Sequence, residues 1–196
     1  MKVTLNESTI LHLIQDTYGS SSNTINYLNP SIKHLNQCVN QIHPLKYAKT
    51  RNYLQGYVTQ LSRYISSGVI SISSIVDTIL EHNDFSTSAP LLQQLLWRAY
   101  FKHILSFNPE ATSLSLGLYK TGFNETDYSH ELPDDILNAQ TPNLIINHFI
   151  STLVQEGYLH NHARLYLSSY MIHFRRIRWS VGANWMFYHL VDADMA

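Results

Sequence analysis

The chain has 196 residues and carries 13 Lys and Arg against 14 Asp and Glu, which leaves a net charge of −1. Hydrophobic residues make up 44% of the chain and charged residues only 14%. This composition excludes wholesale disorder, a strongly basic nucleic-acid-binding protein and an acidic tail. The length favours a single domain and is sufficient to bury a sizeable hydrophobic core.

The first half of the chain predicts a linker followed by helices. Polar turn-forming residues predict the linker at positions 18–31. Residues 45–66 have the apolar spacing of a helix, which Gly68 is expected to end. The apolar side chains of this predicted helix are Leu54, Val58, Leu61 and Ile65. Ser71 is expected to cap the next helix, whose apolar stripe consists of Ile72, Ile75, Val76, Ile79 and Leu80.

The middle of the chain predicts one helix and one long loop. The helix is expected to follow Pro90, where apolar residues recur at helical spacing. Residues 106–142 contain several prolines and glycines and show no sustained period, so they predict a long loop over the surface.

The last third of the chain again predicts helices. One should start after Pro142 and end near Gly157, with a buried face formed by Leu144, Ile145, His148, Phe149, Thr152 and Leu153. Residues 162–174 are apolar on nearly all sides, which predicts a buried helix. Ser180 is expected to cap a final helix that runs through Leu190. The sum is an all-α fold of six or seven helices with no convincing strand.

The sequence also predicts a cytoplasmic protein without a membrane partner. The N-terminal residues MKVTLNEST lack the apolar core of a signal peptide. The longest uncharged runs, such as residues 64–76, are too short or too polar for a transmembrane helix. The single Cys38 excludes an intramolecular disulfide and a cysteine-based zinc finger, and it fits a reducing compartment.

Two clusters of candidate functional residues lie in the first half of the chain. Tyr47, together with the hydroxyls of Thr59 and Ser62, can bind phosphate near a helix terminus, although such hydroxyls more often bond to a carbonyl of their own helix. Trp97 and Arg98 can flank an aromatic ligand. The alternative for this pair is a core tryptophan beside an arginine that reaches solvent.

A further cluster joins residues 158–164 to the end of the chain. A buried Arg164 requires a carboxylate partner. Asp192 and Asp194 follow the last predicted helix, where carboxylates oppose the helix dipole and need a partner of their own. Asp192 is therefore the candidate partner of Arg164, with a ligand N–H donor or a solvated tail as alternatives. His160 and His162 alone are weak evidence for a metal, and we predict no metal site.

Three arginines, at positions 175, 176 and 178, form a separate cluster between aromatic residues. Such a group can contact phosphate. It can equally be a solvated helix end, where cations suit the C-terminal dipole.

These clusters, in this order, resemble the FAD-binding helical domain of the DNA photolyase/cryptochrome family. The resemblance covers residues 44–196, and residues 1–43 would form a helical or linker segment before this domain. Its motifs are a Thr-x-Leu-Ser turn, a Trp-Arg helix, a His-Asn-x-x-Arg motif and an Asp-x-Asp loop, carried by the stretches 50–71, 91–105 and 157–196.

The resemblance implies a role for each matching residue. The FAD pyrophosphate would be held by Tyr47, Thr59, Gln60, Leu61 and Ser62. The flavin pocket would include Gln94, Arg98, Asn161, Arg164, Asp192 and Asp194, with Arg164 paired to Asp192 beside the isoalloxazine ring. Trp97 would face a lesion base, and Trp179 would match the middle tryptophan of a chain that relays an electron to the flavin.

The sequence departs from the family pattern in several places. Gln94 replaces a glutamate that can exchange a proton, His162 replaces an arginine, and Tyr158 replaces a tryptophan. No antenna domain precedes the matching region. The sequence ends after the Asp-x-Asp loop, so the expected fold is an irregular helical bundle that is incomplete at its C-terminus, with the flavin pocket open on one side.

Three functions are compatible with this pattern. The first is a photolyase-like flavoprotein that binds FAD and DNA, with light-driven electron transfer to a pyrimidine lesion as the ancestral, deoxyribodipyrimidine photo-lyase activity. The second is a non-repairing cryptochrome-like flavin module, in which a second copy or another chain covers the open face. The third is a helical binding domain that has lost the flavin.

Overall fold

The computed structural model describes residues 32–113, 119 and 122–195 of the chain. Within these residues the chain is helical and forms no strand, and one isolated parallel bridge joins Ser129 to Ile177. The predicted all-α fold is confirmed. The predicted linker at residues 18–31 lies outside the described residues. No helix in the described part of the chain combines the length and hydrophobicity that crossing a bilayer requires.

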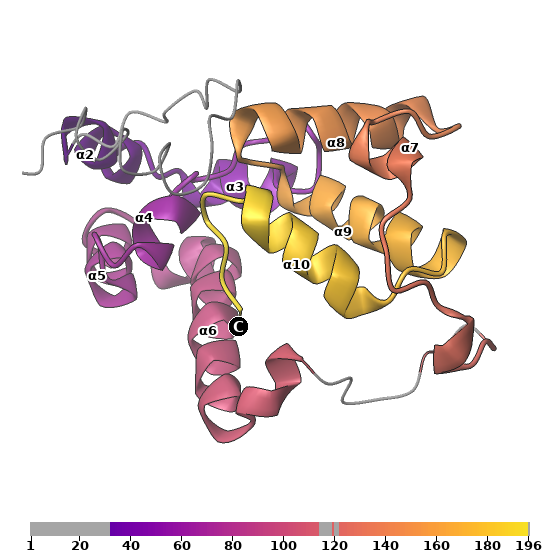
Figure 1. Cartoon of the computed structure of the whole chain (residues 1–196). Helices are drawn as coiled ribbons and strands as arrows, with labels where there is room; N and C mark the ends of the chain where they lie inside the picture. Colours follow the sequence, from indigo (N-terminus) through magenta and orange to yellow (C-terminus); the bar gives the residue numbers. More distant parts are fainter. Residues whose placement is uncertain (1–31, 114–118, 120–121, 196) are drawn as a thin grey trace, which may run out of the picture.

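The first half of the described chain builds one hydrophobic core. Its helices are α2 (Ile32–Asn40), α3 (Pro44–Thr50), α4 (Ser62–Ser66), α5 (Ile72–His82) and α6 (Phe85–Phe107). In Figure 1 the long α6 stands beside α4 and α5. Leu35 of α2 is buried in the same cluster as Leu61 and Ile75, so this part of the N-terminal segment packs onto the rest of the chain. The domain boundary after residue 43 stays a prediction.

The single helix expected over residues 45–66 is wrong, because the chain breaks it between α3 and α4. A tight loop turns back over Thr50, whose hydroxyl accepts a hydrogen bond from the Tyr57 amide at 2.9 Å. Gly56 permits this loop, since a Cβ at that position would lie 1.7 Å from the Thr50 carbonyl oxygen. The predicted apolar stripe is divided accordingly: Leu54 is exposed, whereas Leu61 is buried.

Two helix starts were predicted in this half, with different outcomes. Ser71 caps α5 as expected, because its hydroxyl accepts the Ser74 amide at 3.0 Å. The helix expected to follow Pro90 begins earlier, at Phe85, and contains Pro90 as its sixth residue. Pro90 lies beyond the first turn and cannot donate to the carbonyl four residues earlier, yet the helix continues through it to Phe107.

The second half builds another core and begins with the long loop. The loop after α6 contains the 3₁₀ turns η1 (Pro109–Thr112) and η2 (Glu125–Asp127) and the short α7 (Asp134–Leu137). It leads to α8 (Leu144–Glu156), α9 (Asn161–Ser169), the π-helical turn η3 (Tyr170–Phe174) and α10 (Trp179–His189). In Figure 1 α8, α9 and α10 lie together, and the segment after α10 turns toward α4 and α6.

Three predictions in this half need correction. α8 buries Ile146, Phe149, Ile150 and Leu153. Three residues that were predicted on the buried face are exposed, namely Leu144, Ile145 and His148. The helix expected over residues 162–174 is not buried on all sides, because Leu165 and Tyr166 face solvent and only its Ala163, Leu167 and Met171 are buried. α10 starts one residue before Ser180, and its N-cap Arg178 forms no side-chain cap. The predicted end of α8 at Gly157 is confirmed, with φ at +64°.

Candidate functional site

Asp192 is the centre of a polar cluster that joins the two halves of the chain. The residue is buried, with 4% of its surface exposed. Its Oδ2 accepts hydrogen bonds from the Ser62 hydroxyl at 2.5 Å and from Arg164 Nη2 at 2.8 Å. The Ser66 hydroxyl donates to the Asp192 backbone carbonyl at 3.0 Å. The predicted pairing of Arg164 with Asp192 is therefore present, and α4 contributes the two serines that complete it.

A second ion pair lies next to the first. Arg98 Nη2 on α6 donates to Asp194 and also to the Ser66 hydroxyl, the latter at 2.7 Å. Lys102, one turn further along α6, brings its Nζ to 3.3 Å from the same Asp194 carboxylate. Ser66 thus accepts from Arg98 and donates to the Asp192 backbone, so its hydroxyl links the two ion pairs.

The position of the two aspartates depends on Gly157. The Val191 amide donates to the Gly157 carbonyl at 2.8 Å, which fixes the segment after α10 against the end of α8. A Cβ on Gly157 would lie 2.7 Å from Val191 Cγ1, and its left-handed φ also favours glycine. The same residue therefore ends α8 and admits the segment that carries Asp192.

Arg164 is held by more than its carboxylate. It is the fourth residue of α9, and its Nε donates to the Leu159 carbonyl at 2.7 Å. Its guanidinium carbon lies 5.4 Å from the centre of the Tyr158 ring. Burial raises the pKa of the Tyr158 hydroxyl, the Arg164 charge opposes this, and the Asp192 charge adds to it. The Tyr158 hydroxyl, next to the Arg164–Asp192 pair, therefore stays protonated.

The cluster contains buried polar atoms that no described residue satisfies. They are Asp192 Oδ1 and Arg98 Nε, and the neighbouring α4 and the start of α9 add Arg63 Nη1 and His160 Nε2. Unpaired buried polar atoms cost free energy, so the two on Asp192 and Arg98, which are linked through Ser66, are consistent with a site that a polar ligand completes.

His160 is a helix cap rather than an evident metal ligand. Its Nδ1 accepts the backbone N–H of His162 at 3.2 Å at the start of α9. Burial lowers the pKa of His160, and the neighbouring charges of His162 and Arg164 lower it further. No group of three or more His, Cys, Asp or Glu in the described ranges is arranged to hold a metal ion.

The predicted residues of the Thr-x-Leu-Ser turn divide between core and site. Leu61 is 2% exposed and belongs to the hydrophobic core, so its side chain is not available to a ligand. Ser62 donates its hydroxyl proton to Asp192 and cannot donate the same proton to a phosphate. Gln60 is exposed, with a left-handed φ of +53°, and Tyr47 packs partly buried against the core.

The other predicted residues lie around the cluster at different depths. Gln94 is half-buried on α6, one turn before Arg98. Trp97 is 48% exposed and stacks on Phe101, with ring centres 5.8 Å apart. Asn161 is exposed at the first position of α9. Trp179 begins α10, about 15 Å along the helix axis from His189, whereas Asp192 follows the other end of that helix.

Two of the three arginines at positions 175–178 have carboxylate partners, and the third lies over an aromatic ring. Arg175 makes a bidentate pair with Asp135, with N–O distances of 2.7 and 2.9 Å. Arg178 pairs with Glu125 at 3.0 Å, and Arg176 lies 4.8 Å from the centre of the Phe123 ring. All three hold the long loop against the second core. Both sequence interpretations are corrected for Arg175 and Arg178, because the loop supplies carboxylate partners that local spacing cannot reveal, and they stay predictions for the exposed Arg176.

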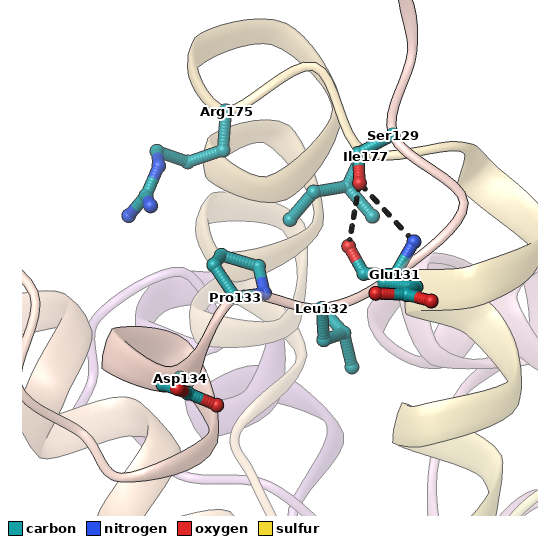
Figure 2. Close-up of a pocket in the computed structure, with 7 residues that line it drawn as sticks. All are labelled: Ser129, Glu131, Leu132, Pro133, Asp134, Arg175 and Ile177. Carbon is teal, nitrogen blue, oxygen red and sulfur yellow. Dashed lines mark hydrogen bonds between the residues drawn. The ribbon is translucent and has the colours of Figure 1, made fainter.

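Figure 2 shows a pocket of about 530 Å³ beside this arginine cluster. Ser129 bonds through its hydroxyl to the backbone of Glu131, which shapes one wall. The lining shares no residue with the Asp192 cluster and consists of Ser129, Glu131, Leu132, Pro133, Asp134, Arg175 and Ile177. The pocket is therefore separate from the candidate site.

Sequence reasoning missed three residues of the site: Arg63, Ser66 and Lys102. Helical spacing offered a signal for two of them. Ser66 lies four residues after Ser62, and Lys102 lies four residues after Arg98, so each shares a helix face with a predicted residue. No comparable signal marked Arg63.

Known proteins are similar to this chain in sequence. A deoxyribodipyrimidine photo-lyase from Alkalihalophilus pseudofirmus is 28% identical over 140 residues, covering 69% of this chain and 28% of the relative. The tomato cryptochrome DASH, chloroplastic/mitochondrial, is 26% identical over 154 residues, covering 76% of this chain and 26% of the relative. The chain thus spans little more than a quarter of the length of these relatives.

Two solved structures share the fold. The bacterial class III photolyase from Agrobacterium tumefaciens has a TM-score of 0.65 at 23% identity and covers 84% of this chain and 34% of its own. The Synechocystis cryptochrome has a TM-score of 0.66 at 19% identity and covers 99% of this chain and 37% of its own. The family model for the FAD binding domain of DNA photolyase matches residues 91–196, more than half of the sequence. The chain belongs to the family of the FAD binding domain of DNA photolyase.

Proposed function

We propose that this chain binds FAD against the two ion pairs of the Asp192 cluster. The observation that carries the proposal is the unpaired Asp192 Oδ1, a buried acceptor, together with the unpaired donor Arg98 Nε, on two residues that Ser66 links by hydrogen bonds. The pyrimidine edge of a flavin presents an N–H donor between two carbonyl acceptors, which is the complementary set. The residues present therefore fit the cofactor of their family.

The ion pairs would hold the ring rather than react with it. Arg164, fixed by Asp192 and by the Leu159 carbonyl, would lie beside the isoalloxazine ring. Arg98 from α6 and Asp194 from the segment after α10 would hold the same edge, with Gln94 one turn before Arg98 as a neutral hydrogen-bonding neighbour. Tyr47, Thr59 and Gln60 would face the pyrophosphate, while Ser62 would orient Asp192.

We further propose light-driven electron transfer to a pyrimidine lesion in DNA as the activity from which this domain derives. Bound FAD would supply the photochemistry, and the protein would supply binding and orientation. Trp97, half-exposed beside Arg98, would stack on the lesion base, and Asn161 would lie between flavin and DNA. Trp179, at the far end of α10, would relay an electron without touching the ring.

We also propose a cytoplasmic location, which the lone cysteine, Cys38, supports.

The second candidate, a non-repairing flavin module completed by another chain or a second copy, is favoured by two observations. Gln94 cannot exchange a proton where the family has a glutamate. The exposed face of α6 carries four large hydrophobic residues close together, which is typical of an interface. They are Leu96, Trp97, Tyr100 and Phe101.

Three measurements test these proposals. The purified chain, mixed with FAD and desalted, should retain the blue absorption of an oxidised flavin, and Arg164→Ala should lose it. A wild-type chain that stays colourless refutes FAD binding. Illumination of the reduced complex with a dimer-containing oligonucleotide then distinguishes the two candidates: restored thymines support repair. An oligonucleotide that stays unrepaired, together with a self-associated protein in sedimentation, supports the non-repairing module.

A further inference from the structure

We propose that Arg63 is an anion anchor of this chain and holds the pyrophosphate of FAD, which deepens the FAD-binding function proposed above and rests on it. Arg63 is the second residue of α4 and directly follows Ser62, whose hydroxyl bonds to Asp192. Its side chain therefore begins at the edge of the Asp192 cluster.

The guanidinium of Arg63 is fixed in place, yet one of its nitrogens has no acceptor. Its Nε donates to the Gln60 carbonyl at 3.4 Å, and its Nη2 donates to Gln60 Oε1 at 3.2 Å. Its carbon lies 5.6 Å from the centre of the Tyr64 ring. Nη1 is buried and donates to nothing within the described residues. A buried guanidinium nitrogen without an acceptor is costly, and a ligand oxygen would relieve that cost.

The surroundings of Arg63 place it in the same site as the two ion pairs. Burial raises the pKa of the Tyr158 hydroxyl, and the charges of Arg164, Asp192, Arg63 and Tyr47 act on the same hydroxyl. The charge of Arg63 therefore reaches the same hydroxyl as the Arg164–Asp192 pair. Because Arg63 also directly follows Ser62, which donates to Asp192, we place it at the edge of the site.

The charge balance of the site also favours an anion. Arg164 pairs with Asp192, and Arg98 and Lys102 share Asp194. Arg63 makes no ion pair within the described part of the chain. Four cations thus face two carboxylates, and the two negative charges of a pyrophosphate would neutralise the excess. A planar guanidinium suits two phosphate oxygens better than a single carbonyl.

The backbone before Arg63 supports a ligand-binding role. Gln60 adopts a left-handed φ of +53°, which is disfavoured for a residue with a side chain. This conformation places the Gln60 carbonyl and amide oxygens on two of the Arg63 nitrogens and leaves the third unoccupied. Backbone strain of this kind persists where the surroundings enforce it, and it is common at ligand sites.

Binding titrations that compare FAD with riboflavin, which lacks phosphate, test the inference. Flavin fluorescence should show that wild type binds FAD at least about tenfold more tightly than riboflavin. Arg63→Gln should weaken FAD binding by about tenfold to a hundredfold, the range for a lost charged hydrogen bond, and leave riboflavin binding unchanged. Arg63→Lys should be intermediate, because it keeps the charge and loses the planar fork.

The matched control is Arg176→Gln, which removes the same charge from an exposed arginine that stacks on Phe123. It should leave both affinities unchanged. Equal losses for FAD and riboflavin in Arg63→Gln, or no loss, would overturn the anchor while FAD binding stands. A wild-type chain that binds FAD and riboflavin equally well also overturns the anion anchor, whatever the variants show. A wild type that binds neither flavin refutes the proposed function itself.

Discussion

Asp192→Ala is expected to destabilise the folded chain by about 3 kcal/mol, because it removes the acceptor of two buried hydrogen bonds. The donors are the Ser62 hydroxyl and the Arg164 guanidinium, and the Asp192 side chain is 2% exposed. A hydrogen bond to a charged group contributes about 1.5–3 kcal/mol. The lower limit applies to each bond, since Arg164 is 22% exposed and water can solvate part of its charge after the change.

Urea unfolding at fixed pH measures this loss, and Asp135→Ala is the matched control. Asp135 also accepts two hydrogen bonds from one arginine, Arg175, but these two side chains are 30% and 26% exposed. The control should therefore cost only about 1 kcal/mol or less. In thermal melts Asp192→Ala should lower Tm by about 6–12 °C. Equal losses in the two variants would refute the reasoning that burial makes the Asp192 bonds strong.

Three further outcomes follow from the geometry. Gly157→Ala should lower the free energy of unfolding by about 1–3 kcal/mol and weaken flavin retention, because its Cβ would displace Val191 and the segment that carries Asp192. Unchanged stability in urea unfolding and unchanged flavin retention after desalting would contradict this. The pKa of His160 is lowered chiefly by burial, so the unfolded chain takes up the proton first and stability should fall as the pH drops below about 6.5. His160→Asn keeps a good N-cap and should flatten the pH dependence of the unfolding free energy in urea titrations. An unchanged pH dependence would show that another group causes it. Arg175→Gln should expose the long loop to limited proteolysis without changing FAD affinity, and an altered affinity would place the loop in the site.

The functional site could be predicted in part because its strongest requirement is electrostatic. A buried arginine in residues 158–164 and two carboxylates after the last helix each need a partner, whatever the surrounding fold. Family resemblance placed Arg164 opposite Asp192, and the structure joins them at 2.8 Å. Neither source indicated that Ser62 would donate to Asp192 or that Ser66 would link the two ion pairs, because these contacts connect residues more than 120 positions apart.

By itself the sequence determined the features that depend on neighbours along the chain. The α5 stripe with its Ser71 cap and the glycine end of α8 follow from hydrogen bonds and dihedrals that span only a few residues. The tertiary structure decided the rest. It divided the apolar run of residues 45–66 between core and solvent, rotated the buried face of α8, and gave the three arginines at 175–178 their partners in the loop. Local spacing shows that a face is apolar or that a cation needs a partner, but which surface covers that face, and which distant oxygen reaches that cation, depends on how the folded chain brings remote segments together.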